Sequence, residues 1–301
     1  MKKIRYLIET VFAYILFAIF TILPLDWASS FGGFLGRFIG HNFAVSRKAT
    51  DNLKKAMPEL SDDEIQKTII GMWDNLGRIM AEYPHLPKLE KKGRVIVEND
   101  SVLLEAEKKG KPIIFITGHI GNWEVLHFIV NARAKNEMAL VFRAPNNPWV
   151  DKLLQRIRNK GTKIQIAKGA KGAKEIVKLI KKGLNVGMLV DQKMNEGIPI
   201  PFFGRNAMTV TSVAQLGLKY DCTIIPVCCK RLSGANFKVT FYDEIELFNS
   251  GQTQKDIEAN MRYINEMLEG WIREDPEQWL WLHRRWPHSR VDKEFLEAKL
   301  K

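Results

Sequence analysis

The amino-acid sequence predicts an α/β protein with a mostly parallel central sheet and crossover helices, preceded by an N-terminal hydrophobic membrane helix. The first observation is that short apolar runs alternate with helical patterns between about residues 94 and 242, which is the order of strands and crossover helices in parallel sheets. The second is that residues 6–25 carry one charge, Glu9, over the length of a bilayer span. We therefore expect a membrane-anchoring segment at residues 1–45 and a second domain at residues 46–301, which no repeat or flexible linker divides.

The N-terminal segment fits a membrane helix, a signal peptide or a buried core helix. Pro24-Leu25-Asp26-Trp27 follows it, which is unlike the small-residue cleavage site that closes a signal peptide. Residues 31–39 are amphipathic and glycine-rich, as expected of a piece lying in the membrane interface. Both a spanning and an interfacial arrangement stay open. Basic residues flank the segment on both sides, and we place the body in the cytoplasm because a basic surface and reduced cysteines suit that side.

The elements of the body are expected in the following order. A helix opens at Ser61-Asp62-Asp63-Glu64, an acidic start typical of helix N-termini, and its pattern runs to about Glu82. The strand patterns cover residues 94–98, 113–117, 138–143, 163–167, 186–190, 223–228 and 237–242. The helical patterns cover residues 100–109, 122–134, 148–160, 170–182, 208–219 and 253–274.

Composition narrows the partners and the compartment. The chain has 301 residues, of which 46% are apolar, and a formal net charge of +12. This balance favours acidic partners, such as anionic lipids, phosphorylated substrates, an acidic carrier protein or nucleic acid. Cys222, Cys228 and Cys229 fall in or beside one apolar run. We expect them to be buried thiols in a reducing compartment and not a disulfide framework.

The strongest functional signal is Gly118-His119-Ile120-Gly121-Asn122-Trp123-Glu124. It follows the predicted strand 113–117, so a strand end delivers His119 to a glycine-flanked turn, as in many α/β active sites. The two glycines and Asn122, a candidate N-cap, interrupt the helix that follows. The imidazole can then fold back towards the carboxylate of Glu124. A carboxylate that fixes the tautomer of a histidine makes it a usable general base.

Metal binding is the alternative for this stretch. His127 lies three residues after Glu124 on the same predicted helix, so His119, Glu124 and His127 offer three ligands. The chain has no HExxH pair, and no further His or Cys cluster lies nearby. We therefore predict no metal and no cofactor.

Two further strand ends lie on the same predicted edge as His119. Arg143 follows one strand and opens a loop fixed by prolines and asparagines, Asn147 among them. An arginine there can stabilise an oxyanion or hold a phosphate, or it is one solvated side chain of a surface turn. Asp191 follows another predicted strand, residues 186–190, and is expected to orient Arg143 or a substrate hydroxyl.

Basic and aromatic residues complete the candidates. Arg156 and Arg158 belong to a basic patch that six lysines between residues 168 and 182 continue. Most of it fits a solvated helix face, and anionic lipid or a carrier protein is the alternative. Phe203 lies in an apolar, proline-containing segment that suits the wall of a hydrocarbon site. Arg284 and Arg285 stand in a tryptophan-rich stretch at residues 277–286, which fits a membrane interface better than single-stranded nucleic acid.

Taken together, these motifs resemble the lipid A biosynthesis lauroyl and myristoyl acyltransferases of the lysophospholipid acyltransferase-like superfamily. Residues 118–124 look like the family's His-x4-Asp/Glu signature, and residues 142–148 look like its aromatic-Arg-x-x-x-Asn-Pro block. Arg156 and Arg158 are similar to its arginine pair. Asp191, residues 201–204 and residues 276–286 fit the later blocks. The resemblance covers most of the chain and implies a glycerolipid acyltransferase-like fold, with residues 46–301 as the acyltransferase domain.

The resemblance implies a membrane-bound O-acyltransferase at the cytoplasmic side of the bacterial inner membrane. The donor would be acyl-carrier protein, or acyl-coenzyme A, and the acceptor a lipid A precursor in lipopolysaccharide biosynthesis. His119, Glu124 and Arg143 are expected to be catalytic. The expected substrate contacts are Asn122, Asn147, Arg156, Arg158, Asp191, Phe203, Arg284 and Arg285. The alternatives are acylation of a phospholipid or a mannosylated lipid, and a non-enzymatic basic protein that binds membrane or nucleic acid.

Overall fold

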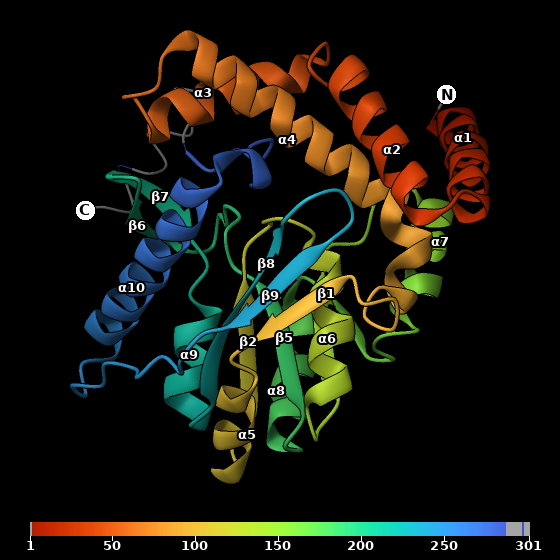
Figure 1. Ribbon diagram of the computed structural model, residues 1–301. Helices are drawn as coiled ribbons and strands as arrows, with labels where there is room; N and C mark the ends of the chain where they lie inside the picture. The colour runs from red at the N-terminus through yellow and green to blue at the C-terminus, as the bar shows by residue number, and fades with distance from the viewer. Residues whose placement is uncertain (1, 287–296, 298–301) are drawn as a thin grey trace.

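A seven-stranded sheet forms the centre of the computed structural model, which describes residues 2–286 and 297 (Figure 1). The strand order is β1-β9-β8-β2-β5-β3-β4. The parallel strands are β2 (Ile113–Thr117), β3 (Met138–Phe142), β4 (Gln165–Ala167), β5 (Asn185–Leu189) and β8 (Thr223–Arg231). At one edge β9 (Phe237–Phe241) runs antiparallel to β8 and pairs in parallel with β1 (Val95–Glu98). The predicted α/β class with a mostly parallel sheet is confirmed.

Two apolar cores lie on the opposite faces of this sheet. Side chains alternate along a strand, so Ile113 and Phe115 of β2 join one core while Ile114 and Ile116 join the other. Helices α5 (Ser101–Lys108) and α6 (Leu126–Arg133) cover the first face. Helices α8 (Ala170–Lys181), α9 (Ser212–Tyr220) and α10 (Thr253–Glu274) cover the second.

Three helices cross above the sheet: α2 (Leu25–Gly40), α3 (Ala44–Ala56) and α4 (Asp62–Glu82) (Figure 1). Helix α4 begins with a capping box in which Ser61 and Glu64 satisfy each other's backbone N–H groups, so its predicted bounds are confirmed. Helices α2 and α4 pack backbone to backbone. A Cβ on Gly36 would lie 2.0 Å from the Trp73 carbonyl oxygen, and one on Gly77 would lie 2.1 Å from that of Gly32.

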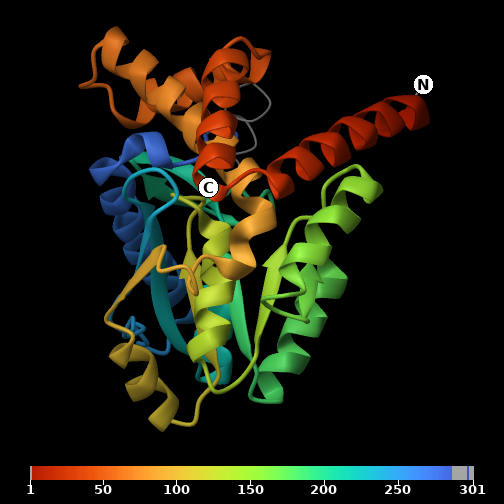
Figure 2. The ribbon, with the colours of Figure 1, turned by 45° about the vertical axis from the view of Figure 1, so that its right-hand side comes forward.

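Helix α1 (Lys2–Ile22) extends away from the rest of the chain and touches it at α2, α4, α7 (Pro148–Arg158) and the 3₁₀ segment η1 (Tyr83–Lys88) (Figure 2). Most of its apolar side chains are exposed. Within residues 2–286 and 297, it is the one helix that is long and apolar enough to cross a membrane. The predicted N-terminal hydrophobic helix is therefore present, while its place in a membrane and the division of the chain at residue 45 stay predictions.

The structure also contains elements that the sequence pattern did not predict. The apolar, proline-containing segment around Phe203, which was not expected to contain strands, forms an antiparallel hairpin of β6 (Ile198–Phe202) and β7 (Arg205–Thr209). Its two-residue turn, Phe203-Gly204, has positive φ angles of 51° and 67°, as type I′ hairpin turns require. Helix α9 consequently begins at Ser212 and not near residue 208, and α3 was not expected. The three cysteines are buried and free, as predicted.

Candidate active site

His119 and Asp191 meet at the carboxyl edge of the sheet, because each follows the end of one of two neighbouring strands, β2 and β5. The Nδ1 atom of His119 lies 2.7 Å from Oδ1 of Asp191. The other carboxylate oxygen accepts hydrogen bonds from the backbone N–H of His119 at 2.8 Å and from Nε1 of Trp279 at 2.7 Å. The carboxylate therefore fixes both the ring and the backbone of His119.

These contacts define which nitrogen of His119 carries a hydrogen. Burial alone would raise the pKa of Asp191, but the interactions with His119 and the bond from Trp279 outweigh it and hold that pKa well below its usual value. Asp191 is thus a carboxylate that only accepts hydrogen bonds. Nδ1 of His119 must donate to it, which leaves the lone pair of a neutral imidazole on Nε2, the arrangement of a general base.

The expected contact between His119 and Glu124 is not formed, and this part of the prediction is wrong. Residues 123–125 form a 3₁₀ turn, η2 (Trp123–Val125), whose start has no side-chain cap from Asn122. The turn directs Glu124 to Arg158, which donates from Nε to Oε2 at 3.0 Å and from Nη2 to Oε1 at 2.5 Å. Both side chains are buried. Asp191 takes the place expected for Glu124, because β5 lies directly beside β2.

The alternative of metal binding requires a cluster of ligands, and the described part of the chain contains none. Within residues 2–286 and 297, no three His, Cys, Asp or Glu side chains gather as ligands. His119 faces Asp191, and Glu124 faces Arg158. His127 is buried, and burial lowers its pKa to about 4.

The turn that carries His119 is held by the C-terminal stretch. The backbone N–H of Gly121 donates to the Gln278 carbonyl at 3.0 Å, and that of Leu280 donates to the His119 carbonyl at 3.1 Å. Gly121 has a φ of +55°, and a Cβ there would lie 2.0 Å from the Cys229 carbonyl oxygen. Only glycine suits this conformation and this close approach.

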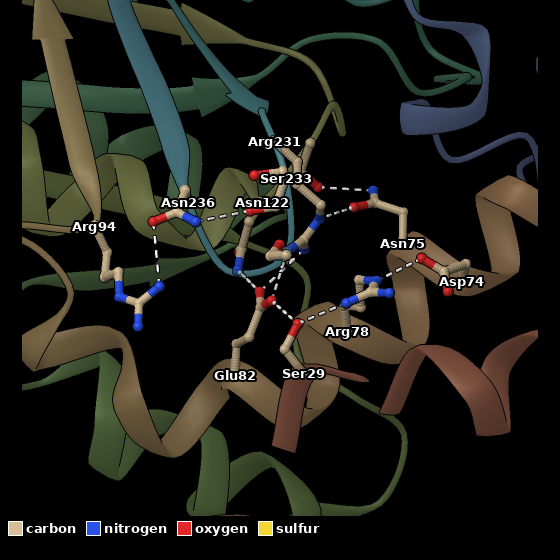
Figure 3. A network of polar contacts seen from close by, with 12 residues as sticks. Ser29, Asp74, Asn75, Arg78, Glu82, Arg94, Asn122, Arg231, Ser233 and Asn236 are labelled. Atoms are coloured by element: carbon tan, nitrogen blue, oxygen red, sulfur yellow. Dashed lines mark hydrogen bonds and ion pairs between the residues drawn. The ribbon is translucent and has the colours of Figure 1, made fainter. Parts of the chain in front are cut away.

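Helix α4 holds the same turn from the other side through Glu82, which is fully buried (Figure 3). Glu82 accepts hydrogen bonds from Asn122 Nδ2 at 2.8 Å and from Ser29 Oγ of α2 at 2.7 Å. Arg231, the last residue of β8, donates to both of its carboxylate oxygens, at 2.5 and 3.0 Å. Asn122 therefore faces into the protein, where it connects the turn to α4.

Asn75 gives α4 a second contact with the turn, two helical turns before Glu82. Its Nδ2 donates to the Gly121 carbonyl at 3.0 Å, and its Oδ1 accepts from Arg231 Nε at 2.8 Å (Figure 3). One helix thus fixes two consecutive residues of the turn, close after His119. Sequence reasoning missed Asn75 and Glu82, since nothing in the periodic pattern of α4 distinguishes a buried polar contact from a solvated position, and it missed Arg231 at the end of β8.

Arg143 lies on the predicted edge but not beside His119. It follows β3, and β5 separates β3 from β2, the strand that precedes His119. Its side chain is exposed, as are those of Arg156 and Arg284. These three arginines are open to a substrate or a partner.

Three other predicted substrate contacts are occupied within the protein. Asn147 caps α7 by accepting from the Trp149 N–H at 3.1 Å, and it donates to the Tyr6 carbonyl of α1 at 2.9 Å. Phe203 is buried in the hairpin turn. Arg285 is fully buried and donates to the Met208 carbonyl, and burial lowers its pKa to about 10.

Two residues beside the base were not expected from the sequence. Gln192 Nε2 lies 3.0 Å from His119 Nε2 and 2.7 Å from His283 Nε2. Gln192 directly follows Asp191, so its position in the chain is a signal that could have identified it.

An apolar cavity of about 50 Å³ lies behind the turn, between α6 and strands β2, β3 and β5. Trp123 and Glu124 line it on the side of the active site, and Met138 and Gly187 line it deeper in the sheet. The ring of Trp123 is 5.0 Å from that of His119. The cavity therefore begins next to the candidate base.

Comparisons with known proteins identify the family of the chain. Residues 1–288 match the model of the family described as bacterial lipid A biosynthesis acyltransferase. A lipid A biosynthesis acyltransferase of Haemophilus influenzae is 23% identical over 86% of this chain and 81% of its own length. The lipid A biosynthesis lauroyltransferase of Escherichia coli is 23% identical over 78% and 76%, and the palmitoleoyltransferase of the same organism is 24% identical over 82% and 79%. The chain therefore belongs to the bacterial lipid A biosynthesis acyltransferase family and is an acyltransferase of lipid A synthesis.

Proposed function

We propose that this enzyme transfers a fatty acyl chain from an acyl thioester, carried by acyl-carrier protein, to a hydroxyl of a lipid A precursor. The contact between His119 Nδ1 and Asp191 Oδ1 at 2.7 Å carries this proposal, because it leaves Nε2 as the proton acceptor that such a transfer needs. The names of the related transferases support the choice of the acceptor.

In this mechanism His119 Nε2 takes the proton of the acceptor hydroxyl as its oxygen attacks the thioester carbonyl. Asp191 stabilises the imidazolium that forms. The tetrahedral intermediate then expels the thiol, which receives the proton from His119. A cysteine acyl-enzyme is disfavoured, because burial raises the pKa of Cys222 to about 11 and that of Cys229 to about 12, and thiols react as thiolates.

Arg143 is proposed to bind an anionic group of the substrate. It lies at the same edge as His119, but β5 lies between the two strands that precede them. At ordinary strand spacing, this places the two residues about 10 Å apart. This distance favours a phosphate of the acceptor or donor over the oxyanion at the reacting carbon. The exposed Arg156 and Arg284 are proposed to extend the same basic surface.

The exposed apolar surfaces of α1 and α2 support a membrane location at the cytoplasmic side of the bacterial inner membrane. Trp27, Phe31, Phe34 and Phe38 are exposed and follow one face of α2. Such a stripe, next to the exposed α1, fits the headgroup and acyl boundary of a bilayer. The exposed lysines of α8 offer a complementary surface to an acidic carrier protein.

The cavity behind Trp123 is proposed to receive the first carbons of the acyl chain. Its volume of about 50 Å³ is enough for only a few water molecules, so a longer chain requires side chains to move. Met138 closes it against Gly187, where a Cβ would lie 2.7 Å from the methionine sulfur.

Mass spectrometry of total lipid A from cells with and without the protein tests this function. We expect the lipid A of the deletion strain to lack one acyl chain, and expression of the wild-type protein, but not of His119→Ala, to restore it. Unchanged lipid A together with an altered phospholipid or mannosylated lipid would contradict the proposed acceptor. Restoration by His119→Ala would contradict the proposed base.

A further inference from the structure

The carboxamide of Gln192 joins the rings of two histidines at the reacting position. Its Nε2 atom is within hydrogen-bond distance of Nε2 of both His119 and His283, and the two ring centroids are 5.3 Å apart. The nitrogen of His119 that it contacts is the one that must take a proton in acyl transfer. In the resting enzyme the base is thus already engaged.

The directions of these hydrogen bonds follow from the neighbouring carboxylate. Since Asp191 accepts from Nδ1 of His119, Nε2 of the neutral ring has a lone pair and needs a donor. The NH₂ group of Gln192 has two hydrogens, one for each imidazole. His283 must then also accept at Nε2, which requires a neutral ring. Burial lowers the pKa of His283 to about 4, in agreement with that state.

We propose that Gln192, held by His283, caps the lone pair of His119 until the acceptor hydroxyl displaces it, and thereby suppresses hydrolysis of the acyl thioester. This inference rests on the proposed function, because it assumes a thioester donor. The side chain of Gln192 is only half-buried, so its amide has room to turn away from His119. One hydrogen of the amide can stay bonded to His283 when this happens.

The suppressed reaction is a direct competitor of transfer. A water molecule at Nε2 of His119 would lose a proton to the ring as its oxygen attacks the thioester carbonyl. The carbon–sulfur bond would then break, giving a fatty acid and a thiol that takes the proton back. The amide occupies the lone pair that this water needs, whereas an acceptor bound by its own contacts can displace it.

The test measures the release of free fatty acid from dodecanoyl-acyl-carrier protein without acceptor, and acyl transfer with a lipid A precursor, for the full-length enzyme. Gln192→Ala should raise the ratio of hydrolysis to transfer by about fivefold or more, which is the factor that one ordinary hydrogen bond represents. His283→Phe should shift the ratio in the same direction, because the amide loses its second contact. Gln215→Ala, at an exposed position on α9, is the matched control and should leave the ratio unchanged.

Gln192→Glu adds a discriminating variant of the same length. Its carboxylate would accept a hydrogen bond from Nε2 of His119 and, together with Asp191, hold that ring as an imidazolium between two carboxylates. Hydrolysis and transfer should then both fall. Equal losses of both reactions in Gln192→Ala, or an unchanged ratio in both Gln192→Ala and His283→Phe, would overturn the cap. A wild-type enzyme that transfers no acyl chain to the precursor would instead contradict the proposed function.

Discussion

Arg158 donates two hydrogen bonds to Glu124, one to each carboxylate oxygen, and both side chains are buried beside the active site. Burial would raise the pKa of Glu124, but the charge and hydrogen bonds of Arg158 outweigh it and lower that pKa. The positive charge of Arg158 and the negative charge of Glu124, both residues of predicted motifs, thus neutralise each other. We infer that this pair supports the turn carrying His119 and does not act on the reacting atoms.

Arg158→Ala should therefore destabilise the protein. Removing one partner of a buried ion pair leaves the other charge uncompensated, which typically costs about 3–5 kcal/mol. Denaturant unfolding in detergent would measure the loss. Arg156→Ala is the matched control, because Arg156 lies two residues away on the same helix but is exposed. An equal stability of the two variants would contradict a supporting role for the pair.

Glu82→Gln should lower turnover as well as stability, although Glu82 belongs to α4 and not to the catalytic edge. The change removes the charge that balances Arg231 and loosens the contact with Asn122. A displacement of about 1 Å at a reacting group can cost up to about 10²-fold in rate. Ser29→Ala removes the hydrogen bond from α2 and the one that Ser29 accepts from Arg78, but it leaves the charge of Glu82 in place, so its effect should be much smaller. Unchanged kcat in folded Glu82→Gln would show that α4 does not position the turn.

Acid should destabilise the protein through His127. Its folded-state pKa of about 4 lies below the ordinary value of 6.5, so the unfolded chain binds the proton more strongly. The stability that the neutral ring contributes is present above pH 6.5 and is lost as the pH falls towards 4, by on the order of 3 kcal/mol.

Unfolding free energies measured between pH 4 and 7 check this expectation. The slope should be shallower in His127→Gln, and the part that remains includes His283, whose pKa is also lowered to about 4. His41→Gln removes an exposed imidazole and serves as the control. If His127→Gln kept the full wild-type slope, protonation of His127 could not be its cause.

The aromatic stripe of α2 should contribute to membrane binding. The double variant Phe34→Ser/Phe38→Ser should bind more weakly to vesicles of anionic lipid, by roughly tenfold for each phenylalanine if each contributes about 1.5 kcal/mol. Flotation at 0.5 M salt suits the measurement, since exposed charge attraction is then screened. The control is Phe248→Ser, which removes an exposed phenylalanine outside α2. Equal binding of the double variant and the control would exclude the stripe from the membrane contact.

The sequence predicted elements well where local pattern decides the structure. Strand β2 and helix α10 have the expected bounds, because an apolar run and a long amphipathic period identify them. The β6–β7 hairpin was missed because Pro199 and Pro201 argue against a strand. Each strand of a two-stranded hairpin has one edge without a partner strand. The backbone nitrogen of each proline, which has no hydrogen to donate, therefore needs no ladder hydrogen bond there, and the prolines are tolerated.

The partners of the site were harder to predict because they depend on spatial order. His119 and Asp191 were both placed at strand ends, but the sequence does not reveal that β5, third to follow β2 along the chain, lies beside it in the sheet. Glu124 was assigned to His119 because the two are close in sequence, whereas Arg158 lies 34 residues further on. Glu82 and His283 reach the site from helices and loops whose packing no local pattern encodes.

The pairing of His119 with Asp191 is tested most directly by the kcat of Asp191→Asn and Glu124→Gln, each compared with wild type at saturating donor and acceptor. Asparagine at residue 191 keeps the size of the side chain but cannot stabilise the imidazolium, so kcat should fall by about 10² to 10⁴, the usual range for general-base catalysis. Any decrease of kcat in Glu124→Gln should instead match the decrease in the amount of folded protein. Near wild-type turnover of Asp191→Asn, with Glu124→Gln folded but inactive, would contradict the account and return the orienting role to Glu124.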